Sequence, residues 1–127
     1  MERLAWVCLG GAAGSGMRYL LAGWVQRLAG PSFPAGTLAV NLLGSFALGL
    51  VMPLGLRTDL ISPTTRLALA TGLMGGFTTY STFSYETMSL MHEGAWAAVA
   101  LNVASTLVGC LAATFLGYGL AVRWIEG

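Results

Sequence analysis

Long apolar stretches separated by short polar breaks dominate this chain. Four stretches cover residues 4–28, 35–56, 63–92 and 95–125. Each holds roughly the 20 apolar residues that a helix needs to cross the ~30 Å hydrocarbon core of a bilayer. The pattern predicts an all-α membrane protein with four transmembrane helices in a single transmembrane domain, residues 1–127.

Turn-forming residues separate and interrupt these stretches. Pro31 and Pro34 break the chain after the first stretch, because each proline removes a backbone donor. The third stretch is too long for one regular span. Its middle holds Gly75 and Gly76, followed by β-branched and hydroxyl residues that form helix poorly. We therefore expect the third helix to be broken near residues 75–79.

The composition excludes several classes of protein. Charged residues make up only 9% of the chain, against about a quarter in soluble domains, so lipid must be its main solvent. A net charge of +1 excludes a basic surface for nucleic acid. Cys8 and Cys110 lie inside apolar stretches without a Cys-x-x-Cys or Cys/His pair, so neither a zinc site nor a disulfide framework is expected.

Topology and packing leave two questions open. The termini and the connector after the second helix share one side, which holds most of the arginines. The positive-inside rule places that side in the cytoplasm, but the bias rests on few charges, so insertion in both orientations stays open. The pairs Gly10/Gly14 and Gly72/Gly76 predict tight helix packing, either within one chain or between chains.

Polar side chains gather at three places in the apolar background. Thr37 and Asn41 are four residues apart and share a face of the second helix. The fourth helix carries Asn102, Ser105 and Thr106. A lone membrane hydroxyl usually bonds back to its own helix. Five serine and threonine residues lie within residues 78–84, however, and this cluster predicts a lining for something polar.

The residues alone leave the charge of the bound ion open. A broken helix frees carbonyl oxygens, which suit a cation. Hydroxyls, an amide and aromatic ring edges are donors or positive edges, which suit an anion. No helix carries an acidic ring of the kind that lines many cation pores. The pattern therefore indicates a donor-rich polar track through a small helical membrane protein.

These motifs resemble the Fluc/CrcB family of fluoride channels over nearly the whole chain. The most specific motif is the run in the third helix, Gly72-x-x-Gly75-Gly76-x-Thr78-Thr79-Tyr80-Ser81-Thr82-Phe83-Ser84-x-Glu86. The first helix adds Gly10-Gly11-Ala12-Ala13-Gly14-x-x-x-Arg18-Tyr19. The second helix adds Gly36-Thr37-Leu38-x-Val40-Asn41-Leu42-x-Gly44.

The resemblance implies an antiparallel, dual-topology homodimer in the cell inner membrane. Two pores would run along the subunit interface and export fluoride passively from the cytoplasm, which relieves its toxicity. A structural Na⁺ would sit at the dimer centre on the carbonyls of Gly75 and Thr78. No nucleic acid partner is implied.

The resemblance also implies a set of site residues. Asn41 would donate to fluoride, and the ring edges of Tyr80 and Phe83 would face the anion. Thr37, Ser81 and Thr82 would belong to the polar track. Arg18 would give the vestibule a positive charge, and Glu86 would lie near the pore entrance. Two positions depart from the family pattern: Tyr80 stands where phenylalanine is usual, and Cys110 where a small hydroxyl residue is common.

Other functions remain as alternatives. A proton-coupled small-molecule exporter needs a carboxylate deep in the first helix, which has only Glu2 at its edge. A proton-coupled fluoride exporter is a second transporter alternative, and a purely structural membrane subunit a third. An intramembrane protease would pair a serine such as Ser15 with a histidine, but His92 lies at a helix end. We therefore expect no enzyme.

Overall fold

The computed structural model describes all 127 residues, and it is helical throughout. The first two helices are α1 (Glu2–Ala29) and α2 (Ala35–Arg57). The third consists of α3 (Pro63–Leu67), the π-helix η1 (Ala68–Met74) and α4 (Gly75–Phe77), followed after a gap by α5 (Tyr80–His92). The fourth is α6 (Trp96–Glu126). The prediction of an all-α chain with four helices and a broken third is confirmed.

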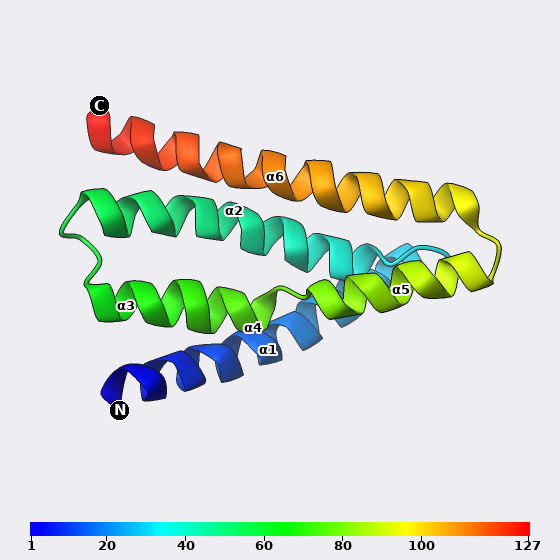
Figure 1. Ribbon diagram of the computed structural model, residues 1–127, viewed down its shortest axis with the longest axis horizontal. Helices are drawn as coiled ribbons and strands as arrows, with labels where there is room; N and C mark the ends of the chain where they lie inside the picture. Colours follow the sequence, from blue (N-terminus) through cyan, green and yellow to red (C-terminus); the bar gives the residue numbers. More distant parts are fainter.

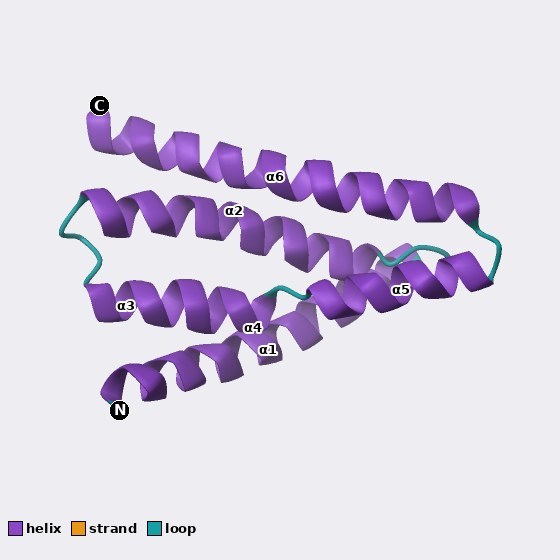
Figure 2. Cartoon of the chain, viewed as in Figure 1, coloured by secondary structure: helices purple, strands orange, loops and turns teal.

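The helices run back and forth along one axis (Figure 1). The two termini and the α2–α3 connection lie at one end, and the other two connections lie at the opposite end. Figure 2 shows how little of the chain is loop, and it places the break between α4 and α5 near the middle of the molecule. α2 packs mainly on α6, whereas α1 packs chiefly on η1 and also on α2 and α4.

Local sequence explains where the helices end. Gly30 has a φ of 84°, a left-handed conformation that glycine adopts without strain, and it terminates α1. Gly94 has a φ of 73° in the turn before α6. At the start of α3, the Ser62 hydroxyl accepts a hydrogen bond from the Thr65 amide at 3.1 Å, and Pro63 occupies the first helical position.

Glycines allow the helices to approach each other within one chain. A methyl group added at Gly14 would overlap the carbonyl oxygen of Leu73 in η1. One added at Gly76 would overlap the carbonyl of Gly11 in α1. The predicted tight packing of these glycine faces therefore joins α1 to the third helix of the same chain.

Two of the helices are long and apolar enough to cross a membrane by themselves. They are α2 and α6, and only 33% and 11% of their most apolar windows are buried inside the molecule, so neither is an enclosed core helix. The other two expected spans fall short by this measure. Glycines and Arg18 lower the hydropathy of α1, and the break divides the third helix.

Candidate functional site

The break in the third helix is made by two residues in extended conformation. Thr78 has φ −90° and ψ 158°, and Thr79 has φ −151° and ψ 116°. The Thr78 hydroxyl donates to the Met74 carbonyl at 2.9 Å and so completes the end of α4. The Thr79 hydroxyl oxygen accepts from the Thr82 amide at 3.2 Å and caps the start of α5. The break is thus a defined joint between two capped helix ends.

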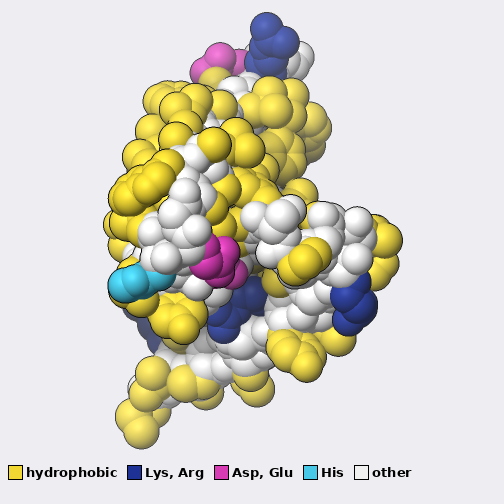
Figure 3. Space-filling view, turned by 90° about the vertical axis from the view of Figure 1, so that its right-hand side faces the viewer, with side chains coloured by type: hydrophobic (Ala, Val, Ile, Leu, Met, Phe, Trp, Pro, Cys, Tyr) yellow, Lys and Arg dark blue, Asp and Glu magenta, His cyan; other side chains and the backbone are white.

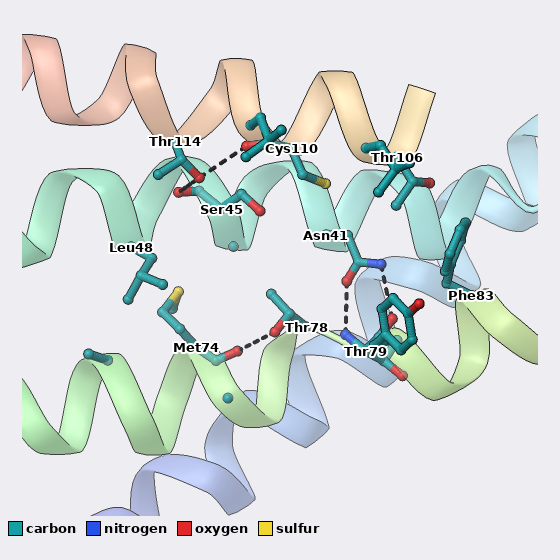
Figure 4. Close-up of a pocket in the computed structure, with 16 residues that line it drawn as sticks. Asn41, Ser45, Leu48, Met74, Thr78, Thr79, Phe83, Thr106, Cys110 and Thr114 are labelled. Atoms are coloured by element: carbon teal, nitrogen blue, oxygen red, sulfur yellow. Dashed lines mark hydrogen bonds between the residues drawn. The ribbon is translucent and has the colours of Figure 1, made fainter. Parts of the chain in front are cut away.

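The Asn41 side chain binds this joint from α2. Its Nδ2 donates to the Thr79 carbonyl at 3.0 Å, and its Oδ1 accepts from the Thr79 amide at 2.8 Å (Figure 4). Both residues are buried. An asparagine amide carries two N–H donors, and only one of them has an acceptor in the chain. Asn41 therefore holds the break in place and retains one free donor.

Carbonyl oxygens of the break lack the partners of a continuous helix. The Thr78 amide donates to Met74, and the Thr79 amide donates to Asn41, so neither reaches the Gly75 carbonyl. The Thr78 carbonyl accepts no hydrogen bond from the chain. Gly75 is exposed, and no atom lies within 4 Å of the position a Cβ would take.

The larger cavity lies on the α6 side of the break and measures about 440 Å³. Asn41 and Phe83 line it together with one face of α6 (Figure 4). Tyr80 lines it as well. Phe83 is 7% exposed, whereas Tyr80 is 77% exposed, and their ring centroids lie 5.6 Å apart at a tilt of 53°. The Thr106 hydroxyl is buried against this cavity without a hydrogen-bond partner.

A second cavity of about 360 Å³ lies on the α1 side of the break. Arg18, Thr37 and Glu86 line it, and the Thr37 hydroxyl donates to Glu86 Oε1 at 2.7 Å. The other carboxylate oxygen, Oε2, is buried without a partner. Figure 3 views the molecule from the right-hand side of Figure 1 and shows acidic and basic side chains close together at a hollow in the surface. Thr79 lines both cavities, so the break separates them.

The predicted site residues fall into two groups around the break. The larger cavity is lined by Asn41, Gly75, Thr78, Tyr80 and Phe83. The second cavity is lined by Arg18, Thr37, Thr82 and Glu86. Ser81 lines neither cavity: it is exposed, and its hydroxyl lies 3.5 Å from that of Thr79.

Sequence reasoning left several lining residues unassigned. Thr79 joins both cavities, and α6 contributes Thr106, Cys110 and Thr114 to the larger one. The three α6 residues are four apart and so share one helix face. That spacing could have marked the three residues as one face of the fourth helix. Thr79 belongs to the predicted hydroxyl cluster, but the sequence did not show that its backbone pairs with Asn41.

A buried chain of hydrogen bonds joins α6 to Phe83. Asn102, which is 1% exposed, donates through Nδ2 to the Thr87 hydroxyl at 3.0 Å. The Thr87 hydroxyl donates in turn to the Phe83 carbonyl at 2.7 Å. No other side-chain hydrogen bond links α5 to α6. This chain is therefore a buried polar link between α6 and the helix that carries Phe83.

Comparison with known proteins gives consistent results along the whole chain. The sequence profile of the CrcB-like protein family, Camphor Resistance (CrcB), matches residues 5–118. The "Fluoride-specific ion channel FluC" of Anaeromyxobacter dehalogenans is 53% identical over 127 residues, 100% of both chains. That of Sorangium cellulosum is 54% identical over the same span. That of Geobacter sulfurreducens is 49% identical over 117 residues, 92% of this chain and 94% of the relative.

Proposed function

The chain belongs to the CrcB-like family, and we propose that it is a fluoride-specific ion channel. It is a membrane protein, and its relatives are named as ion channels, which are not enzymes. The protease alternative of Ser15 and His92 is thereby excluded. The observation that carries the proposal is a full-length likeness to fluoride channels in a chain whose break is lined with hydrogen-bond donors.

Fluoride is small and strongly hydrated, so a pore must replace its water with donors at several weak sites. The free N–H of Asn41 and the unpartnered hydroxyl of Thr106 are two such donors in the larger cavity. The edges of the Tyr80 and Phe83 rings carry partial positive charge and supply further contacts. On the other side of the break, Arg18 would attract the anion into the second cavity.

The functional unit in this proposal is an antiparallel, dual-topology homodimer with two pores along the subunit interface. One chain leaves Tyr80 77% exposed beside the larger cavity. It also leaves Gly75 open on its surface. A second copy packed against this face would cover the ring and close the cavity. Polar groups at membrane depth are tolerated only when protein or water surrounds them, and a second copy of the chain would supply the protein.

The same interface would hold a structural Na⁺ at its centre. Carbonyl oxygens suit a hard cation, and those of Gly75 and Thr78 lack the hydrogen bonds of a continuous helix. Two oxygens are too few for a cation site, and the matching pair of a second chain would complete it. The residues therefore fit the ion, which would supply a fixed positive charge between the two pores.

The positions of the acidic side chains favour passive export through the inner membrane over proton-coupled transport. The only acid of α1 is Glu2, which is exposed in its first turn. Glu86 accepts a hydrogen bond from Thr37 and lines the second cavity. No carboxylate lies deep in α1, where a proton-coupled exporter of the small multidrug type would need one.

Liposome flux tests the proposal directly. Purified protein should release fluoride from liposomes under a membrane voltage, with no pH gradient, and should release no chloride. Asn41→Asp removes both N–H donors, the free one and the one to the Thr79 carbonyl, and keeps the acceptor for the Thr79 amide. Phe83→Ile removes the ring edge. Each should lower fluoride efflux by at least about tenfold, the cost of a lost charge-assisted contact. Folded, assembled protein that passes no fluoride would refute the proposal.

A further inference from the structure

Gln26, near the end of α1, uses its whole side-chain amide to bind the loop that leads into α2. Its Nε2 donates to the Gly30 carbonyl at 2.6 Å and to the Phe33 carbonyl at 2.8 Å. Its Oε1 accepts from the Gly36 amide at 3.1 Å. Glutamine alone combines two donors and an acceptor at this length. No other side chain forms a hydrogen bond with residues 30–36.

The third of these bonds replaces a missing helix cap. α2 begins after Pro34, which has no side-chain group to cap the first turn. A capping oxygen normally accepts from the second or third amide of a helix, and Gly36 is the second residue of α2. Gln26 therefore caps α2 from the preceding helix. It fixes the start of α2 against the end of α1.

The capped turn carries a polar contact that lines the second cavity. Thr37 directly follows Gly36 and donates to Glu86 at 2.7 Å. A methyl group at Gly36 would overlap the Ala22 carbonyl, so this turn already lies against α1 with no room to spare. Gln26 itself lines the second cavity and the smaller one beside it, and Glu86 lines both as well.

We propose that Gln26 is a positioning residue of the fluoride entrance: it holds the first turn of α2 so that Thr37 meets Glu86. This inference rests on the proposed function. Gln26 acts through Thr37 and does not line the larger cavity with Asn41 and Phe83. Its loss should therefore raise the fluoride concentration that gives half-maximal efflux and leave the maximal rate nearly unchanged.

The test uses full-length protein in liposomes with a range of internal fluoride concentrations. Gln26→Met keeps the length and removes all three bonds, and Gln26→Glu keeps only the acceptor for Gly36. Gln26→Met, which loses the cap of Gly36, should raise the half-saturating concentration about fivefold. Gln26→Glu, which keeps that cap and loses the two bonds to the loop, should raise it by a smaller factor. Ser32→Ala is the matched control, because Ser32 is exposed in the same loop without a side-chain hydrogen bond, and it should match the wild type.

A double mutant separates positioning from general support of the fold. If Gln26 acts through Thr37, then Gln26→Met added to Thr37→Val should change the half-saturating concentration less than about twofold. The inference would be overturned if the effects of Gln26→Met and Thr37→Val on the half-saturating concentration multiplied in full. It would also be overturned if the single variants of Gln26 matched the wild type. Should Gln26→Met fail to assemble, Gln26→Glu carries the same comparison. Wild-type protein without fluoride flux would refute the proposed function instead.

Discussion

Replacing Gly14 by alanine should push α1 away from the third helix. The new methyl group would overlap the Leu73 carbonyl oxygen and lie 2.9 Å from the Phe77 nitrogen and 3.0 Å from the Leu73 carbonyl carbon. These obstacles are backbone atoms, so no side-chain rotation can relieve them. Overpacking that meets movable side chains costs about 1–3 kcal/mol. We therefore expect a loss of about 3 kcal/mol or more at Gly14.

Gly16 provides the matched control on the same helix. No atom of the chain lies within 4 Å of its Cβ position. Alanine forms helix more readily than glycine by about 0.5–1 kcal/mol, so Gly16→Ala should leave stability unchanged or raise it. The two substitutions add the same methyl group two residues apart, and they should have opposite effects.

The assay is the fraction of protein that stays assembled in detergent after heating, read by gel filtration across a temperature series. Gly14→Ala should lower the midpoint by about 10 °C, from the unfolding entropy usual for a chain of this size. Fluoride efflux should also fall, because Phe77 directly precedes the break. Equal midpoints for the Gly14 and Gly16 variants would show that the close approach of α1 contributes nothing to stability.

Three further predictions concern the cavity and the ion. Asn102→Leu leaves the Thr87 hydroxyl without its donor and should cost about 1–3 kcal/mol of stability. The same change in a Thr87→Val background should cost less. Equal costs in the two backgrounds would contradict the hydrogen bond between Asn102 and Thr87. Tyr80→Phe keeps the ring edge and should leave fluoride efflux within about twofold of wild type, whereas Tyr80→Leu should reduce it about tenfold. Exchange of Na⁺ for N-methylglucamine during purification should lower the assembled fraction, and an unchanged fraction would argue against a structural Na⁺.

The sequence predicted the helices well because hydropathy and turn chemistry are local properties. Pro31, Pro34 and Gly94 mark boundaries that the structure retains. The break was also readable, since Gly75, Gly76 and the hydroxyl residues after them form helix poorly. The π-helix of η1 was not readable, because no residue in Ala68–Met74 has a preference for that helix type.

The candidate site was harder to predict than the fold. The resemblance named Asn41 as a donor to the ion, but no residue pattern shows that its amide pairs with both backbone groups of Thr79. Gln26 was also invisible in the sequence, where it is one polar residue near a helix end. Its three partners lie four to ten residues along the chain. Only the folded path of the loop brings them to one amide.

The pairing of Asn41 with Thr79 also joins the two proposed ion sites. The amide that would donate to fluoride is fixed by the residue that follows Thr78, whose carbonyl would bind Na⁺. A shift of the break would therefore move the donor and the carbonyl together. A cation bound there would stiffen the joint, and a stiff joint keeps the free Asn41 donor aimed at the cavity. The proposed Na⁺ would then act on the pore by holding its main donor in place, and not by binding fluoride itself.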